Sequence, residues 1–370
     1  MDYSVRMKVI YAVCSWGLGH ATRSLPVVRR LLSEGNDLTV ISNGRSLELL
    51  KKELGESVEA YVDIPDYPML LSENSRQFMA KSMVYWPMFI RRIEKGLARV
   101  TKMLRNERYD VIVSDARYDV YSKRVPSFFI SHQMRIMNPL RIKMFERGSE
   151  LFNLFFFKRF AGVIVPDYAD EDNLSGELSH NLYRIDESKL YYVGVLSDFK
   201  KKNLRKDIDC LVSITGPEPQ RSLLEKKLLS QIRGLDGKIV VTLGKTEKKD
   251  VVKKGDVEVY SFMTKDERED VLNRAKLVVS RSGYSTILDL AVIGVKALMI
   301  PTPGQIEQEY LGSYHNQRGT FYSVDQEKVD VVRDIEVAKR RTGFTRKVDV
   351  DESVEKIMDV IVNVKKSPFQ

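Results

Sequence analysis

Residues 8–23 read K-V-I-Y-A-V-C-S-W-G-L-G-H-A-T-R, and this stretch points to the fold class. Residues 8–14 form a continuous apolar run, which is typical of a strand buried on both faces of a parallel sheet. Two glycines follow, and then an apolar pattern of helical spacing, with Leu25, Val28 and Leu31 on one side. A buried strand, a glycine loop and an amphipathic helix in this order predict an α/β protein.

The same alternation of strand and helix patterns continues along the chain. Further strands are expected at 38–42, 58–64, 110–115, 126–131, 162–166 and 190–195, and then at 210–215, 238–243, 257–262, 276–280 and 296–301. Helices are expected at 46–54, 87–105, 220–232, 284–293 and 350–364. Such alternation favours mostly parallel sheets with helices on both faces, that is, doubly wound domains.

A polar and basic segment at 197–206, S-D-F-K-K-K-N-L-R-K, separates two series of these patterns and is typical of a linker. We therefore expect two Rossmann-like domains: 1–198 forms the first, 199–350 the second, and 351–370 is a terminal helix that can pack back on the first domain. Ligands of such folds bind outside the carboxyl ends of the strands, so we expect the site in a cleft that both domains face.

The composition is that of a globular protein of 370 residues. Hydrophobic residues make up 43% and charged residues 30% of the chain, which excludes disordered and fibrous classes. No apolar run reaches the about 18 residues of a transmembrane helix, and the charges of Asp2 and Arg6 disfavour a signal peptide. The two cysteines, Cys14 and Cys210, border apolar strand patterns, as expected of free thiols in a reducing compartment. We expect a cytoplasmic location.

The chain is basic, with 60 Lys and Arg against 51 Asp and Glu and a formal net charge of +9. A positive protein attracts nucleic acid, an anionic membrane or an anionic metabolite. The basic residues form separate clusters at 91–108, 200–206 and 245–254, and no nucleic-acid-binding motif accompanies them. A solvated surface is the simplest interpretation of most of these clusters, and we expect no specific nucleic-acid partner.

The first glycine loop predicts an anion-binding turn with a histidine beside it. Gly17 and Gly19 allow a close backbone approach, but Thr22 stands where a dinucleotide-binding loop has its third glycine, which disfavours a dehydrogenase. His20 opens the helix after the first strand, where a neutral imidazole suits a general base; local capping or packing is the alternative. Asp115 ends a later strand and can orient that imidazole; its alternative role is the N-cap of a helical turn.

The most informative segment of the second half is 280–289, S-R-S-G-Y-S-T-I-L-D. Its small and hydroxyl residues at a helix start expose backbone N–H groups to an anion, and Arg281 adds a charged donor. Asp289 follows in the second turn of that helix, where a carboxylate can accept hydrogen bonds from ribose hydroxyls. Further along, Gln308 and Glu309 offer the donors and acceptors that sugar hydroxyls require.

These segments resemble the GT-B superfamily of nucleotide-sugar glycosyltransferases, most closely family 28, which includes the lipid-linked N-acetylglucosaminyltransferase of peptidoglycan synthesis. The segment G-L-G-H-A-T-R at 17–23 resembles the family's glycine-rich loop with its histidine. The segment S-R-S-G-Y-S-T-I-L-D-L-A-V-I-G-V-K-A-L-M-I-P at 280–301 resembles the donor motif, S-R-x-G-x-x-T-x-x-E-x-x-x-x-G-x-P-x-x-x-x-P. The resemblance implies a GT-B fold and glycosyl transfer from a UDP-sugar.

The resemblance also implies a role for each matching residue. His20 matches the proposed base, and Asp115 matches the carboxylate of the plant-type His–Asp pair. Arg281 and Thr286 fall where family members hold the donor diphosphate. Asp289 replaces the usual glutamate on the ribose.

The rest of the expected donor site comes from the same resemblance. Gln308 and Glu309 stand where the family has D-Q or Q-Q for the donor sugar, and Phe262 and Met263 where backbone groups meet the uracil ring. The loop at 215–219, T-G-P-E-P, is poorer in glycine than the family's loop, and Lys296 stands where the family has proline. The expected donor-binding residues are Gly17, Gly19, Gly216, Phe262, Met263, Arg281, Ser282, Gly283, Thr286, Asp289, Gln308 and Glu309.

The mechanism implied by the resemblance is a single displacement with inversion. His20 removes the proton of the acceptor hydroxyl as that hydroxyl attacks the anomeric carbon, and UDP leaves. Arg281 and the helix N-termini stabilise the leaving diphosphate, so no metal and no cofactor is expected beyond the UDP-sugar. A UDP-sugar 2-epimerase of the same fold is one alternative, and a basic nucleic-acid-binding protein is the non-enzymatic one.

One apolar segment bears on the acceptor. Residues 151–157, L-F-N-L-F-F-F, are apolar almost all round and are followed by two basic residues. A core helix of the first domain is the first interpretation. The other is a patch that docks on an anionic membrane, with help from the basic face of Arg91, Lys95 and Arg99, and there meets a lipid-linked acceptor.

Overall fold

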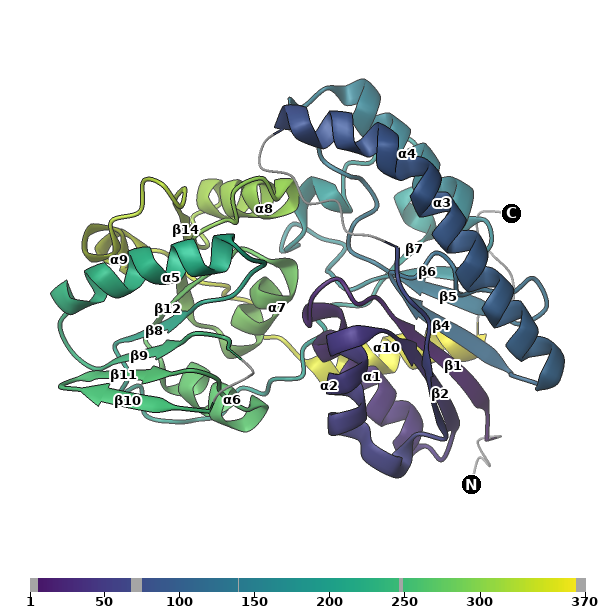
Figure 1. The fold of residues 1–370 in the computed structure, drawn as a ribbon, viewed down its shortest axis with the longest axis horizontal. Helices are drawn as coiled ribbons and strands as arrows, with labels where there is room; N and C mark the ends of the chain where they lie inside the picture. Colours follow the sequence, from purple (N-terminus) through teal and green to yellow (C-terminus); the bar gives the residue numbers. More distant parts are fainter. Residues whose placement is uncertain (1–5, 68–74, 139, 246–248, 364–370) are drawn as a thin grey trace. The chain divides into compact units, whose positions relative to one another are not determined.

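A computed structural model describes residues 6–67, 75–138, 140–245 and 249–363, and Figure 1 shows its course. The chain divides into two compact units. The first unit comprises Met1–Asp198 together with Asp349–Gln370, and the second comprises Phe199–Val348. Three parts of the sequence-based expectations lie outside the described residues: the start of the chain, positions 246–248 of one basic cluster, and the end of the terminal helix.

Within the described residues, the first unit has a seven-stranded sheet in the order β3-β2-β1-β4-β5-β6-β7. Its strands are β1 (Lys8–Val13), β2 (Asp37–Ser42), β3 (Ala60–Asp63), β4 (Val111–Asp115), β5 (Ser127–Ile130), β6 (Gly162–Val165) and β7 (Leu190–Tyr192). Every neighbouring pair is parallel. The order runs outward from β1 in one direction and from β4 in the other, so the topological switch point lies between these two strands.

Helices cover both faces of this sheet. They are α1 (Gly19–Ser33), α2 (Gly44–Leu54), α3 (Ser75–Asn106), α4 (Lys143–Phe157) and α10 (Val350–Asn363), with short 3-10 turns η1 (Gly55–Ser57), η2 (Gly176–Leu178) and η3 (Glu187–Lys189). Side chains alternate along β1: Val9 and Tyr11 belong to one buried cluster, and Ile10 and Ala12 to another that contains Val100 of α3. This alternation explains the continuous apolar run, because both faces of the strand are covered.

The core on the α1 side is completed by the far end of the chain. Leu25 and Val28 of α1 share a buried cluster with Ile357 and Met358 of α10. Figure 1 shows α10, in yellow, beside α1. Burying a large apolar side chain contributes about 1.5–3 kcal/mol, so α10 is a structural part of the first unit.

The described part of the second unit contains a seven-stranded sheet in the order β10-β11-β9-β8-β12-β13-β14. The strands are β8 (Cys210–Ser213), β9 (Ile239–Thr242), β10 (Val251–Lys254), β11 (Val257–Tyr260), β12 (Leu277–Ser280), β13 (Lys296–Met299) and β14 (Tyr322–Ser323). The pairs are parallel except β10 with β11, which is antiparallel. Here the switch point lies between β8 and β12.

The helical elements of the second unit are α5 (Gln220–Gln231), η4 (Ile232–Gly234), α6 (Lys265–Arg274), α7 (Tyr284–Ile293), α8 (Ile306–Gln317) and α9 (Val331–Lys339). Leu224 and Leu228 of α5 and Ile335 of α9 are buried in one cluster with strand residues Val212 and Val279. Thr264 caps α6 reciprocally with Glu267, which satisfies two backbone donors at the helix start.

The sequence-based fold class, α/β with two doubly wound units, is confirmed. Some strands and helices of the structure were not predicted from the sequence, and each has a physical reason. β10 is exposed at every residue, so it lacks the apolar alternation that indicates a strand. α6 and α8 are polar helices with few buried residues, and α3 begins at Ser75 rather than near residue 87 and continues through Pro87.

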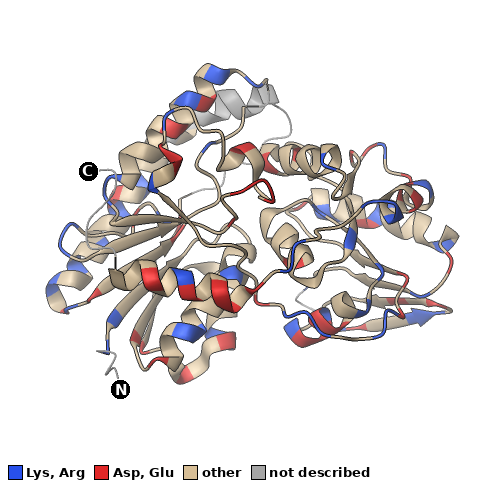
Figure 2. Cartoon of the chain, turned by 180° about the vertical axis from the view of Figure 1, so that it is seen from behind, with Lys and Arg blue, Asp and Glu red and all other residues tan. Residues whose placement is uncertain are grey.

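Basic and acidic side chains are interspersed in both units. In Figure 2, basic and acidic segments alternate along the helices of both units. Ion pairs within one helix illustrate this pattern, such as Arg30 with Glu34 and Arg274 with Asp270. This distribution agrees with the interpretation of most basic clusters as solvated surface.

Candidate active site

The two residues predicted to act as base and orienting carboxylate lie together at the switch point of the first sheet. Asp115 ends β4 directly opposite Val13 of β1, and His20 lies in the first turn of α1, which follows β1. The His20 Nδ1 atom is 2.8 Å from Asp115 Oδ1. The His20 side chain is 19% exposed and that of Asp115 is fully buried, so the imidazole is the only one of the two that can meet a substrate.

Asp115 has a second partner that the sequence motifs alone did not indicate. Arg23 Nε donates to Asp115 Oδ2 at 2.8 Å, and Arg23 Nη2 donates to Oδ1. Ser24 Oγ donates to Oδ2 at 3.0 Å. Arg23 lies three residues after His20, on the same face of α1. This spacing is the sequence feature that places Arg23 near the partner of His20, Asp115.

Electrostatics keep this carboxylate ionised. Burial alone raises the pKa of Asp115, but the charges of Arg23 and His20 and their hydrogen bonds outweigh burial, so the pKa lies well below its usual range. A carboxylate has no proton to donate. The contact with His20 is therefore favourable when Nδ1 carries the proton, and this tautomer leaves Nε2 with a free lone pair.

The two glycines of the first loop differ in backbone conformation. Gly17 has φ of +86°, a conformation that favours glycine, and its carbonyl accepts from Ser46 Oγ at 3.2 Å. Gly19 is the first residue of α1. Both are placed at the end of β1 as expected, next to His20.

The second cluster lies at the switch point of the second sheet. Gly216 follows β8 with φ of +117°, and Arg281 to Gly283 follow β12, with Gly283 as the N-cap of α7. A side chain at Gly216 would meet Arg281 Nε and Thr302 Oγ1, each at 3.6 Å from its Cβ. The structure thus brings the loops after β8, β12 and β13 together.

The guanidinium of Arg281, which is predicted to stabilise a diphosphate, is turned into the protein. Its side chain is 1% exposed. Its guanidinium donates to the carbonyls of Ile300, Pro301 and Gln220 at 3.1, 3.0 and 3.0 Å. Burial lowers the pKa of Arg281 to about 10. Arg281 therefore ties the ends of β12 and β13 to the start of α5, and it shapes the loops rather than pointing out of them.

Gln308 and Glu309, predicted to recognise the donor sugar, lie in the first turn of α8. Gln308 Oε1 accepts from the backbone N–H of Thr302 at 3.0 Å, and Glu309 Oε1 accepts from that of Gly304 at 2.9 Å. Gln308 Nε2 also donates to Gln305. Their side chains thus order the loop between β13 and α8.

The remaining predicted donor residues take varied positions. Asp289 is on α7, 3.9 Å from Arg268 of α6, and its side chain is 13% exposed. Thr286, also on α7, is partly exposed. After β11, Phe262 is partly exposed, whereas Met263 is buried.

Comparison with known proteins now identifies the fold and the activity. Residues 218–331 match the glycosyltransferase family 28 C-terminal domain, and residues 7–134 match glycosyl transferase family 1. The structure of MurG from Acinetobacter baumannii is similar, with a TM-score of 0.61 and 13% identity, over 96% of this chain and 99% of that chain. The chain is a GT-B glycosyltransferase.

Relatives of this glycosyltransferase carry the same general description. A protein of Methanosarcina acetivorans described as an uncharacterized glycosyltransferase is 24% identical over 323 residues, 82% of each chain. The spinosyn rhamnosyltransferase SpnG, solved with thymidine diphosphate, has a TM-score of 0.61 at 11% identity and covers 98% of both chains. These matches favour a transferase over the epimerase and the nucleic-acid-binding alternatives.

Two features are absent from the described residues. None of the described helices of the glycosyltransferase has both the length and the apolar character to cross a bilayer. The described part of the chain also contains no group of three His, Cys, Asp or Glu residues arranged to hold a metal ion.

Proposed function

We propose that this glycosyltransferase transfers a hexose or N-acetylhexosamine from a UDP-sugar to a hydroxyl acceptor, by an inverting displacement that needs no metal. The observation that carries the proposal is the partly exposed His20 imidazole, hydrogen-bonded to a buried, ionised Asp115 at the switch point of the first sheet. A general base needs a free lone pair facing the substrate and a partner that holds its ring. The partial exposure of His20 and its contact with Asp115 support this role.

In the proposed step, His20 Nε2 takes the proton of the acceptor hydroxyl. The acceptor oxygen forms a bond to the anomeric carbon as the bond from that carbon to the diphosphate oxygen breaks. UDP leaves with the electron pair, and a single displacement inverts the anomeric configuration. The imidazolium that forms is stabilised by the carboxylate of Asp115.

The proposed donor site is built on the loops around α7 and α8. Backbone N–H groups at Gly216 and at the start of α7, from Ser282 and Gly283, would hold the diphosphate, since a helix N-terminus stabilises an anion. Thr286 would add a hydroxyl. The buried Arg281 guanidinium would not contact the diphosphate. It would fix these loops by its hydrogen bonds and would place a positive charge near the diphosphate.

Neighbouring residues would bind the ribose, the sugar and the base of the donor. Asp289 would accept from the ribose hydroxyls, Gln308 and Glu309 would face the sugar, and backbone groups of Phe262 and Met263 would meet the base. Solved structures of the same fold were obtained with thymidine diphosphate, so uracil against thymine is the first discrimination to test.

Thermal unfolding in the presence of UDP-, dTDP- and GDP-sugars tests the donor class. A ligand that binds only the folded chain stabilises it by about 2.7 kcal/mol at one hundred times its Kd. We expect UDP-sugars to raise the Tm most. Stabilisation by GDP-sugars alone would overturn the assignment of the base.

We also propose that the acceptor is lipid-linked and is met at an anionic membrane surface, and the support for this lies on α4. Met144, Leu151 and Phe155 of this helix are 70%, 51% and 58% exposed. Phe156 and Phe157, on the other side, are buried at 4% and 0%. The segment is thus a core helix on one side and exposes apolar side chains on the other, and this exposed side supports the proposed membrane patch.

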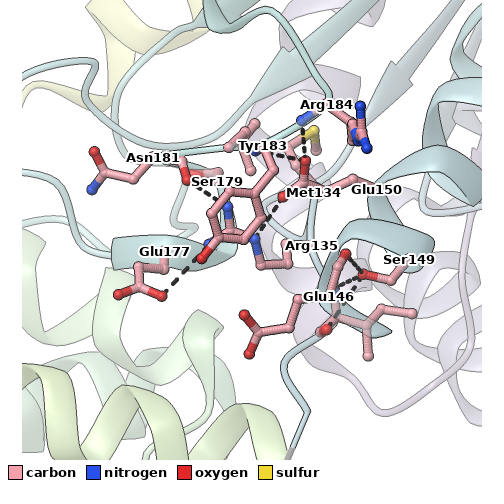
Figure 3. Close-up of polar contacts among 12 residues, drawn as sticks. Met134, Arg135, Glu146, Ser149, Glu150, Glu177, Ser179, Asn181, Tyr183 and Arg184 are labelled. Carbon is pink, nitrogen blue, oxygen red and sulfur yellow. Dashed lines mark hydrogen bonds and ion pairs between the residues drawn. The ribbon is translucent and has the colours of Figure 1, made fainter. Parts of the chain in front are cut away.

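Buried polar contacts anchor α4 in this orientation (Figure 3). Arg135 and Glu150 are both fully buried, and Arg135 Nε donates to Glu150 Oε1 at 2.6 Å. Glu150 Oε2 accepts from the backbone N–H groups of Tyr183 and Arg184 at 2.8 and 2.6 Å. A fixed helix can present apolar side chains to a bilayer, and the exposed Lys143, Arg147 and Lys158 beside them would attract anionic lipid.

A further inference from the structure

Arg23 is the charged residue closest to the His20–Asp115 pair, and the transfer step described above does not use it. It is 3% exposed and Asp115 is 0% exposed, so the two form a buried ion pair. Arg23 Nη2 also lies 2.9 Å from His20 Nδ1. The oxygen Asp115 Oδ1 therefore has both the guanidinium and the imidazole as partners.

The role of Arg23 follows from the charges of the groups around the His20 ring. Without Arg23, a buried carboxylate 2.8 Å from the ring would strongly favour the imidazolium, since a close opposite charge stabilises the charged form. With Arg23, the carboxylate is already neutralised, and a protonated His20 would have a second cation 2.9 Å from Nδ1. The carboxylate of Asp115 and the guanidinium of Arg23 therefore act in opposite directions on a proton of the His20 imidazole.

Two other parts of the chain, β1 and the segment after β5, contribute titratable groups around Arg23. On the side of β5, the Nη1 group of Arg23 is 3.1 Å from Nδ1 of His132, whose side chain is buried. From β1, Tyr11 is fully buried, and the charges of Asp115 and Arg23 act on it in opposite directions. Arg23, Asp115, His132 and Tyr11 are therefore among the titratable and charged groups of this site.

We infer that Arg23 is a positioning residue of the transfer reaction: its ion pair with Asp115 fixes the carboxylate, which accepts from Nδ1 of His20 and so leaves Nε2 of the ring to accept a proton. The inference rests on the proposed role of His20 as base. It assigns to the R of G-L-G-H-A-T-R a function that acts through the histidine and requires no contact with substrate.

A double-mutant cycle on the full chain tests this. The chain has four histidines, so ¹⁵N-histidine NMR, with His20→Ala to assign the signal, follows the His20 ring directly and without an activity assay. In Arg23→Met, we expect the His20 titration midpoint to move up by about one pH unit or more, the size of effect of a close charge. In Asp115→Asn it should move down.

The double variant Arg23→Met/Asp115→Asn distinguishes the inference from a purely structural role. It removes both buried charges together, which is often tolerated by a fold even where a single removal is not. We expect its midpoint to return towards that of the wild type, and Arg23→Lys, which keeps the charge, to remain within about half a pH unit of it. A double variant that titrates like Asp115→Asn, or a folded Arg23→Met with an unshifted midpoint, would overturn the inference.

The kinetic readout separates this inference from the proposed function. If transfer occurs, the acidic limb of the kcat/KM profile should move with the NMR midpoint in each variant, with the donor KM unchanged. If NMR shows the shifts but transfer from UDP-sugars is not detected, the effect of Arg23 on the His20 ring stands as inferred and the proposed donor is wrong.

Discussion

The hydroxyl of Ser282, just before α7, donates a hydrogen bond of 2.7 Å to the backbone carbonyl of Gln308 in the first turn of α8. Gln308 in turn accepts from the backbone of Thr302. Ser282 and Gln308, two of the predicted donor-binding residues, therefore connect the start of α7, the start of α8 and the loop after β13 through side-chain-to-backbone hydrogen bonds. Substitutions here are expected to change stability as well as donor affinity, and the two must be measured separately.

Arg281→Gln should lower the free energy of unfolding by about 2–4 kcal/mol. Several buried carbonyls lose a donor, and each unsatisfied group costs about 1–3 kcal/mol. Urea unfolding measures the loss, and Arg340→Gln, at an exposed arginine of the same unit, is the matched control. Unchanged stability together with lost donor affinity would restore Arg281 as a direct diphosphate ligand.

His20→Ala should lower transfer about 10²–10⁴-fold, the usual contribution of a general base. Donor affinity should change little, because the side chain contacts Asp115 and Arg23 in the first unit. Initial rates at saturating donor and calorimetric titration with UDP measure the two quantities. A variant with nearly wild-type turnover would remove His20 from the mechanism.

Asp289→Ala should weaken UDP binding by about 1–3 kcal/mol, the range for loss of a charged hydrogen-bond partner. Helix α7 remains intact in this variant, so the fold should survive, and urea unfolding checks this. Asp270→Ala is the control, since Asp270 is an exposed carboxylate on α6 that pairs with Arg274. Equal UDP affinity in wild type and Asp289→Ala, measured by calorimetry, would refute the ribose assignment.

Acid should destabilise the chain partly through Asp115. The pKa of Asp115 is lower in the folded than in the unfolded chain, so its contribution to stability is present above the unfolded value, about 3.9, and is lost as the pH falls towards the folded value. Below about pH 4, the wild type should lose up to about 1.4 kcal/mol more per pH unit than Asp115→Asn. Urea unfolding at several pH values compares the slopes, and parallel slopes would contradict the prediction.

The two sides of α4 should respond differently to polar substitution. Leu151→Ser/Phe155→Ser changes exposed side chains, so stability should be kept while binding to anionic vesicles is lost. Phe157→Ser, at a fully buried position, should cost about 3–5 kcal/mol. Co-sedimentation with anionic and neutral vesicles at low and high salt measures binding. Failure of the wild type to sediment with anionic vesicles at low salt would favour a soluble acceptor.

The sequence predicted the positions that depend on strand ends, because parallel strands carry their following loops to the same edge of a sheet. His20 and Asp115 were placed correctly on this basis, 95 residues apart in the chain. The pairing of Arg23 with Asp115 was missed, because which of several polar residues reaches a carboxylate depends on helix rotation and register. Arg281 was placed at the correct loop, but its burial was not predicted, since burial of a long side chain does not follow from a local motif.

The packing of α10 against α1 has a consequence for how the protein is made. The first unit needs Ile357 and Met358 to complete its core, whereas the second unit consists of one continuous segment, Phe199–Val348. On a ribosome, all of the second unit is synthesised before α10 emerges. The second unit can therefore fold during translation, and the first unit, although it begins earlier, must wait for the last helix.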